Sequence, residues 1–399
     1  MEMNVTDGAT GQVLQDTAGQ ALQDAALQDT ALQDAALQDT ALQDTALQDA
    51  ALQKPENRKN QALKNAAEVL CYVALTLLLC IFLQKLTEPK YMSHPYEGAM
   101  MAEYYETETS HDVIFLGDCE FYETISPIEL WEGYGISSYV RGSPQQLIWQ
   151  SYYVLKDTLK HETPQVVVFN AMEMKIGETQ KEEYTRLTLD GLKNLNYRLA
   201  AAKVSLKGDE DSLISYAIPL LRYHSRWSSL TEDDWKYLTG RELISYQGYL
   251  MQTGVEPQTD DYFEQPLFDY TLPERCWEYL DKIAELCEEN GITLVLFKAP
   301  TKSWQYPWYD AWEQQIDEYA AEHGILYVNG LEYVDEMGLD MQTDTYDKGV
   351  HLNVYGAEKC SDFLGDVLTS LGVPDRRSDS ELAAAWEPIC ERYHEAKGE

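Results

Sequence analysis

The sequence predicts an α/β protein with a parallel sheet flanked by helices. From about residue 110 onward, short runs rich in Val, Ile, Leu and Phe alternate with longer segments that carry helix-capping signals. Such alternation is typical of parallel sheets whose strands are joined by crossover helices. The third of these runs, QVVVFN, is apolar almost without interruption, as expected of a strand covered on both faces.

The predicted elements follow one another in a regular order. Strands are predicted over residues 112–118, 135–140, 165–170, 292–297 and 325–328. Helices are predicted over residues 144–161, 276–290, 308–323, and from a cap at Asn353 to about residue 371. Gly291 and Gly324 are typical helix ends, and asparagine is a typical N-cap. Residues 174–275 break the rhythm, and we interpret them as a mostly helical insertion over the functional edge of the sheet.

The chain is predicted to have six parts. They are a low-complexity tail (1–53), a basic linker (54–65), a transmembrane anchor (66–84), a second linker (85–109), the α/β domain (110–375) and an acidic C-terminal tail helix (376–399). The tail repeats Ala-Leu-Gln-Asp units with a leucine every five residues. Because a step of five turns a helix by about 140° past one revolution, these leucines form no single stripe, which disfavours a coiled coil. We expect a partly helical or disordered tail.

Residues 66–84 are apolar with one early interruption at Glu68. Their number is close to that needed to cross a bilayer. A buried core helix and a cleaved signal peptide are the alternatives. The run is apolar on all sides, and the region before it is too long for a signal peptide. Because positive residues are slightly denser before the run than after it, we expect a cytoplasmic tail and an extracytoplasmic domain.

The composition disfavours several functions. The 399 residues carry a net charge of −38, which argues against nucleic-acid binding because phosphate recognition needs a basic surface. The sequence has no glycine-rich phosphate loop and no cluster with metal-ligand spacing, so we predict no cofactor and no metal site. Five of the seven cysteines lie outside the apolar run. That number is odd, and their spacing does not favour a disulfide framework.

Two places combine residue types used in acyl transfer. Asp118 and Cys119 directly follow the first strand, and open α/β sheets bind ligands at the carboxyl ends of their strands. Asp344, Asp347 and His351 precede the last helix, and a carboxylate in such a loop can orient a histidine as general base. A thiol beside a histidine can act as a nucleophile. The alternative is a buried, inert cysteine.

These two places resemble the first and last blocks of the SGNH/GDSL hydrolase superfamily. The stretch VIFLGDCEFYETISP resembles the Gly-Asp-Ser block with cysteine in place of serine, and YDKGVHLNVYGAEK resembles the Asp/His block. Within the superfamily, the chain is most similar to membrane-anchored bacterial members related to the DltD and AlgX types. The resemblance covers about residues 110–372 and implies a three-layer sheet of flavodoxin-like topology.

The resemblance implies roles for individual residues. The implied catalytic residues are Cys119, His351 and Asp347, with Asp344 as the rival of Asp347. The implied oxyanion or substrate-binding residues are Gly142, Asn170 and Asp118. The motif Gly-x-Asn-Asp is absent after the third strand, where NAMEM stands instead. The spacing from Asp347 to His351 is one residue longer than the commonest spacing in the family.

The function that the resemblance implies is an extracytoplasmic acyl-ester hydrolase or O-acyltransferase. It would act on acylated cell-envelope carbohydrate or polymer, with a membrane-bound O-acyltransferase as a partner. The alternative is an inactive module of the same fold that binds envelope polysaccharide. Two secondary features are the cationic stretch 222–227, suited to an anionic polymer, and the tryptophans Trp304, Trp308 and Trp312, suited to sugar rings. Pairing with nearby acids and core packing are their alternatives.

Overall fold

The structure is a computed structural model. It describes residues 30, 33–34, 36–45, 48, 55–88, 100–107, 109–179, 181–206, 213–240, 243–258, 270–301 and 306–398. The chain divides into two compact units, Met1–Cys80 and Ile81–Glu399, and each is described by itself.

In the first unit, residues 36–45 of the repeat are helical and exposed. The other described element is the start of the long helix α2 (Pro55–Thr87), which continues into the second unit. By length and composition, its part from Lys59 to Thr87 is apolar enough to cross a membrane. The predicted anchor at 66–84 lies inside this helix.

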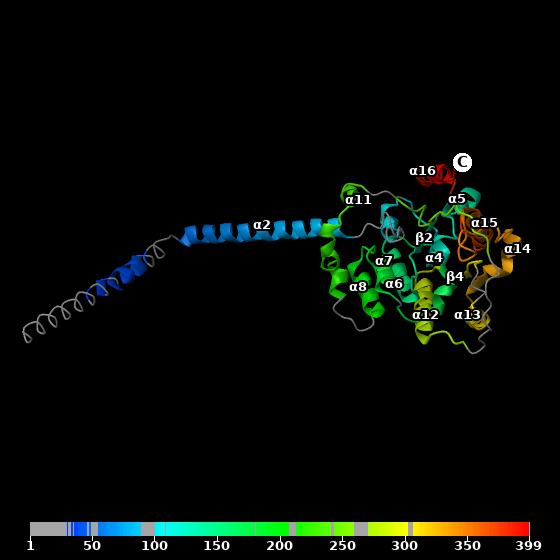
Figure 1. Cartoon of the computed structure of the whole chain (residues 1–399), viewed down its shortest axis with the longest axis horizontal. Coiled ribbons are helices and arrows are strands. Elements are labelled where there is room, and N and C mark those ends of the chain that lie inside the picture. The colour runs from blue at the N-terminus through cyan, green and yellow to red at the C-terminus, as the bar shows by residue number, and fades with distance from the viewer. Residues whose placement is uncertain are drawn as a thin grey trace, which may run out of the picture. The chain divides into compact units, whose positions relative to one another are not determined.

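The second unit is built on a five-stranded parallel sheet, which confirms the predicted fold class (Figure 1). Its strands are β1 (Val113–Gly117), β2 (Ser138–Gly142), β3 (Val166–Asn170), β4 (Thr293–Lys298) and β5 (Leu326–Asn329). Their order is β2-β1-β3-β4-β5, and every neighbouring pair is parallel. This is the flavodoxin-like order, in which ligands bind at the carboxyl edge where the strand order reverses.

Helices cover both faces of the sheet. Those nearest to it are α4 (Cys119–Tyr122), α5 (Pro127–Tyr134), α6 (Ile148–Thr158), α12 (Glu274–Glu289), α13 (Tyr309–His323) and α15 (Val354–Ser370). Alternate residues of β1 enter different cores: Ile114 packs with α6, α12 and α13, whereas Phe115 packs with α4, α5 and α15. This period of two, with both faces buried, explains why the strands are apolar almost throughout.

Short helices and a C-terminal helix complete the unit. They are α3 (Met100–Glu103), η2 (Tyr104–Glu106), η3 (Ala171–Lys175), η7 (Gly330–Tyr333), α14 (Val334–Met337) and α16 (Ser380–Lys397). Trp386 of α16 stacks on Trp131 of α5, with ring centroids 4.9 Å apart. Residues 100–107 fall in the predicted linker, yet Met100 and Tyr104 are buried in the two cores. The domain boundaries as such stay predictions.

The insertion has two parts with different positions. Its helices are α7 (Glu182–Leu189), α8 (Leu195–Ser205), α9 (Leu213–Ala217), α10 (Leu220–Tyr223), η5 (His224–Ser228) and α11 (Glu232–Lys236). Helix α8 packs against α6, beside the sheet. Residues 243–258 instead follow the carboxyl edge, where Leu250 N–H donates to Tyr122 O and Glu256 N–H donates to Thr345 O. This second part is the one near the candidate site.

The region around β2 differs from the prediction. The predicted strand 135–140 is Ser138–Gly142 instead, because Gly135 has φ 69° and ends α5 as a left-handed C-cap. The prediction contains no helix at α5, although its N-cap serine and first-turn proline are typical start signals. Helix α6 starts at Ile148 rather than residue 144, because Gln145 has a positive φ of 50°.

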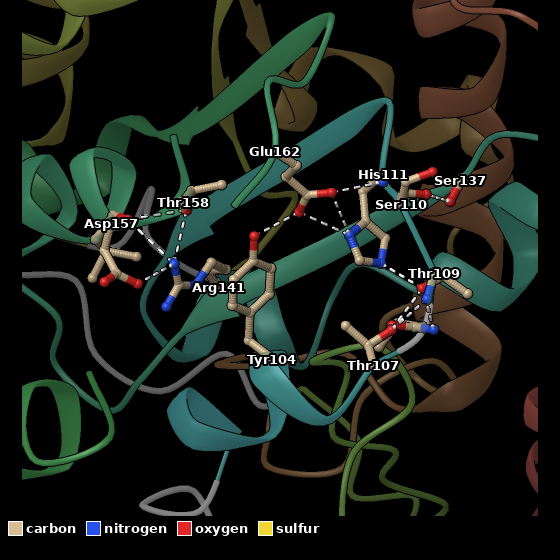
Figure 2. Close-up of polar contacts among 12 residues, drawn as sticks. Tyr104, Thr107, Thr109, Ser110, His111, Ser137, Arg141, Asp157, Thr158 and Glu162 are labelled. Carbon is tan, nitrogen blue, oxygen red and sulfur yellow. Dashed lines mark hydrogen bonds and ion pairs between the residues drawn. The ribbon is translucent and has the colours of Figure 1, made fainter. Parts of the chain in front are cut away.

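Buried polar side chains tie residues 104–111 to the amino end of the sheet; we call Tyr104, Thr109, His111 and Glu162 the amino-end clasp (Figure 2). His111 Nδ1 lies 3.0 Å from Glu162 Oε1, and His111 Nε2 lies 2.8 Å from Thr109 Oγ1. Tyr104 OH donates to Glu162 Oε1 at 2.7 Å. Arg141 stacks on the Tyr104 ring, 3.9 Å from its centre. The polar side chains of the four clasp residues thus hydrogen-bond one another, as stable burial favours.

Candidate active site

The turn after β1 positions Cys119. A Cβ on Gly117 would lie 2.6 Å from Phe121 Cγ, so only glycine lets α4 fold back against the strand. Asp118 caps α4 by accepting the Glu120 backbone N–H at 3.1 Å, the ordinary role of an N-cap aspartate. Cys119 is therefore the first residue of α4, at the carboxyl end of strand β1, between β2 and β3.

Cys119 differs from the other cysteines of its unit. All are free, and Cys119 is half-buried, whereas the remaining four are buried. Those four are Cys276, Cys287, Cys360 and Cys390. A reagent in solution can therefore reach Cys119 before any other thiol in residues 81–399.

His351 lies in the loop that leads into α15. Its Nδ1 is 2.6 Å from Asp347 Oδ2, and its backbone N–H donates to Asp347 Oδ1 at 2.7 Å. The Thr345 hydroxyl donates to His351 O at 2.8 Å, which fixes the loop. The Cys119 thiol and the His351 imidazole lie near enough to shift each other's pKa: His351 lowers that of Cys119, and Cys119 raises that of His351. Because Asp347 engages Nδ1, Nε2 is the nitrogen available to the thiol.

The structure separates the two aspartates that the sequence left as rivals. Asp344 is buried, and its Oδ2 lies 2.7 Å from Lys359 Nζ and accepts the Asp340 N–H at 2.8 Å. The Asp344 carboxylate therefore binds the backbone of its own loop and the side chain of Lys359 in α15. Asp347 is the aspartate that contacts His351.

A second carboxylate, Glu123, faces the same imidazole and was missed by sequence reasoning. Glu123 Oε2 lies 3.4 Å from His351 Nδ1 and accepts the Tyr346 hydroxyl at 2.9 Å. The Tyr346 and His351 rings are nearly parallel, at 18°. Glu123 stands four residues after Cys119, and its N–H donates to Cys119 O. That spacing of one helical turn is the signal that would have placed Glu123 beside Cys119.

Burial and charge set the protonation of the pair. Burial raises the pKa of Cys119 to about 11; Asp118 adds to the rise, and the hydrogen bond from His351 opposes it. Burial lowers the pKa of His351, but hydrogen bonds with Asp347 and Cys119 and the charge of Glu123 outweigh it and raise that pKa. Carboxylates favour a protonated imidazole and disfavour a thiolate.

The implied oxyanion residues have other contacts. Asn170 is buried, and its Nδ2 donates to Asp118 Oδ1 at 2.9 Å while its Oδ1 accepts the Met172 N–H at 3.0 Å. Gly142 is paired with Gly117 across the sheet. A Cβ on Gly142 would lie 2.8 Å from Gly117 O, so glycine is needed for close packing here. Both residues hold the turn that carries Asp118 and Cys119, and their oxyanion role stays a prediction.

A buried lysine stands on the other side of the turn. Lys298, at the end of β4, donates to Ala299 O and to Thr301 Oγ1, and its Nζ is 3.9 Å from Glu120 Oε2. Burial lowers the pKa of Lys298 to about 8, against the opposing charge of Glu120. Lys298 is thereby an ion-pair partner of Glu120.

Other candidates from the sequence fall into packing roles. Trp312 is buried in the core, and Trp308 stacks on Tyr306 with centroids 4.7 Å apart; Trp304 lies outside the described residues. Within the described ranges, no group of three or more His, Cys, Asp or Glu side chains could hold a metal ion.

Solved structures of low sequence identity are similar to this chain. No family model and no curated protein matches the chain. A GDSL-like lipase from Bacteroides thetaiotaomicron VPI-5482 is similar at 13% identity and a TM-score of 0.32, over 69% of this chain and 99% of the lipase. A proposed acylhydrolase from Bacteroides fragilis NCTC 9343 is similar at the same identity and TM-score, over 71% and 99%. The function therefore has to be argued from the site.

Proposed function

We propose that this chain is a membrane-anchored acyl-transfer enzyme, either an ester hydrolase or an O-acyltransferase. Cys119 is the nucleophile, His351 the general base and Asp347 the residue that orients the imidazole. The observation that carries the proposal is the position of His351, which interacts with the half-buried Cys119 and whose Nδ1 lies 2.6 Å from Asp347 Oδ2. A nucleophile, a base and an orienting carboxylate in this order are what acyl transfer needs.

The reaction has two balanced steps. Cys119 Sγ attacks the acyl carbonyl carbon as the thiol proton moves to His351; the ester C–O bond then breaks, and His351 gives the proton to the leaving alkoxide. Water or an acceptor hydroxyl next attacks the thioester, with its proton taken by His351 and returned to Sγ. The products are an acid or a new ester and the free thiol.

The surroundings of the pair imply a dependence on pH. Asp347 and Glu123 favour the imidazolium, and burial and Asp118 favour the neutral thiol, so both pKa values are raised. At neutral pH Cys119 is therefore a neutral thiol and His351 an imidazolium. Together they hold one proton more than the attack requires, because the imidazole must be neutral to accept the thiol proton. Activity is expected to rise as the pH increases and that proton is lost.

We further propose that the domain lies outside the cytoplasm and acts on acylated cell-envelope carbohydrate or polymer, with a membrane-bound O-acyltransferase as partner. The long apolar helix supports action near a membrane, and the denser positive charge before it supports the orientation. Protease added to intact cells should remove the domain if this orientation is right. Protection of the domain until the cells are permeabilised would contradict it.

One observation favours a second function, an inactive module that binds envelope polysaccharide. The raised pKa of the Cys119 thiol, about 11, is that of a poorly reactive group. This alternative predicts that Cys119→Ala leaves polymer binding unchanged and that no acyl-enzyme forms.

The deciding experiment is intact-mass analysis of the full chain after exposure to 4-nitrophenyl acetate, with Cys119→Ala as control. We expect one acetyl group on the native chain, released by hydroxylamine at neutral pH as a thioester is, and none at this position in the variant. His351→Ala should slow the acetylation. Absence of an adduct on the native chain between pH 7 and pH 10 would favour the binding module.

A further inference from the structure

Exposed apolar side chains gather in the first part of the insertion. They are Ile214, Ile218, Leu221, Trp227 and Trp235, with exposed fractions of 58%, 44%, 49%, 73% and 52%. We call these five residues the apolar apron. A solvated helix surface ordinarily carries polar residues there, and a cluster of exposed apolar groups marks a contact with a partner or a membrane.

The first three residues of the apron share one helix face. Ile214, Ile218 and Leu221 follow one another at intervals of four and three, the spacing of neighbours on a helix surface. Backbone hydrogen bonds from Ile218 N–H to Ile214 O and from Leu221 N–H to Ile218 O, both 2.9 Å, continue the turn from α9 into α10. The stripe is therefore continuous across the two short helices.

Two exposed tryptophans follow this stripe along the chain. Among the tryptophans that the structure describes, Trp227 and Trp235 are exposed, and the others are buried or half-buried. An exposed tryptophan loses favourable burial unless something covers it. The amphipathic indole ring is enriched where a protein meets the headgroup level of a bilayer.

The apron adjoins the end of α2. Arg226, next to Trp227, donates from Nη1 to Thr87 O at 2.7 Å, and Leu86 and Thr87 are both buried. The last turn of α2 is therefore built into the domain beside the apron. Because α2 is apolar enough to cross a membrane up to Thr87, a bilayer crossed by this helix has its surface close to Thr87.

The cations of this region do not favour an anionic polymer. Arg222 pairs with Glu182 at 3.6 Å, and Arg226 pairs with Asp234 at 3.1 Å. Both guanidinium groups of the stretch 222–227 thus have carboxylate partners. Because the five apron side chains are apolar, the occupant is expected to be the lipid itself.

We propose that the apolar apron is a membrane-contact surface, which enters the headgroup region of the bilayer that α2 crosses. The domain would then be held at two places, the helix and the apron, so that its orientation toward the membrane is restricted. This inference goes beyond the proposed chemistry and rests on the anchor part of the proposed function alone.

The test uses the tryptophans of the full chain in vesicles of phosphatidylcholine brominated on its acyl chains, which quenches nearby indole fluorescence. Helix α2 contains no tryptophan, so quenching reports on the rest of the chain. We expect stronger quenching than in unbrominated vesicles. The variant Trp227→Phe/Trp235→Phe should lose this difference, and Trp277→Phe, a half-buried residue stacked on Tyr319, should keep it.

Flotation of the vesicles separates the outcomes. If the chain floats with the vesicles and bromination changes nothing, or if the double variant is quenched as strongly as the native chain, the apron does not contact lipid. If the chain does not float, α2 is not an anchor, and the inference falls together with the membrane part of the proposed function. Acetylation of Cys119, measured separately, distinguishes both results from a failure of the proposed chemistry.

Discussion

The two ends of β1 carry similar chemical groups in the same order. At the carboxyl end, a thiol, an imidazole and a carboxylate follow one another in Cys119, His351 and Asp347. At the amino end, a hydroxyl, an imidazole and a carboxylate follow in Thr109, His111 and Glu162, with contacts of 2.8 and 3.0 Å (Figure 2). Judged by the types of the side chains and their order, either of these two groups of residues would be a candidate for catalysis.

The two ends of β1 differ in how exposed their side chains are and in how many hydrogen bonds those side chains make. The His111 side chain is 0% exposed, and Thr109 Oγ1 also contacts Thr107 Oγ1 at 2.6 Å and accepts Gln247 Nε2 at 3.2 Å. Cys119 is half-buried, and the His351 side chain is 15% exposed. The amino-end hydroxyl is thus engaged in several structural hydrogen bonds, whereas Cys119 and His351 are both partly exposed.

The largest effect should come from exchanging the two histidines for alanine. We expect His351→Ala to lower turnover of 4-nitrophenyl acetate by about 10²–10⁴-fold, because general base catalysis contributes that much. His111→Ala should keep most of the turnover and lower the melting temperature instead. Loss of turnover in a folded His111→Ala variant would overturn the comparison.

The next effect concerns the two aspartates. Asp347→Asn should lower kcat by about 10²-fold or more, because the amide cannot orient and stabilise the imidazolium as a carboxylate does. Asp344→Asn is the matched control, since its carboxylate binds Lys359; it should lower stability and change kcat little. Equal losses of kcat in both folded variants would contradict the assignment of Asp347.

At the amino-end clasp, Glu162→Gln should lower the free energy of unfolding by about 1–3 kcal/mol near neutral pH, because buried partners lose a charged acceptor. Burial opposes ionisation of Glu162, but hydrogen bonds from His111 and Tyr104 prevail and lower its pKa. The stability from a lowered carboxyl pKa is present above the unfolded value near 4.5 and is lost as the pH falls through the folded value.

Urea unfolding at several pH values measures this contribution. The difference between native chain and variant should shrink as the pH falls below 4.5, the ordinary glutamate value. Glu278→Gln is the control, because its pair with Lys282 is exposed and such pairs add little. A Glu162 effect that is constant with pH would show that packing, not charge, is responsible.

Local sequence patterns predicted much of this molecule, for identifiable reasons. Strands β1 and β3 were predicted within a residue or two because burial on both faces makes them apolar. β2 was displaced because Gly135, taken as strand, ends a helix at positive φ. Asp344 and Asp347 could not be separated by spacing, since the choice depends on Lys359, which reaches back from α15.

Glu123 shows what local sequence patterns could not predict at the candidate site. Its role depends on a contact with His351, far away in sequence, and on the turn of α4 that brings both to one edge. Likewise, no local pattern shows that Lys298 is buried against Glu120. The protonation of His351 and Lys298 therefore depends on contacts between segments that are far apart in the sequence. The residue types around Cys119 and His351, in contrast, were enough to suggest a thiol nucleophile with a histidine base.

The smallest expected effect comes from Glu123→Gln and shows in the pH profile of kcat/KM. Glu123 raises the pKa of both His351 and Cys119, so its neutralisation should let the pair lose its extra proton at lower pH. The rising limb of the profile should shift to lower pH, with little change at the alkaline plateau. Glutamine still accepts the Tyr346 hydroxyl, so the fold is retained. A limb that stays in place would mean that Asp347 alone sets the charge of His351, and the second carboxylate would then be structural, like the clasp at the opposite end of β1.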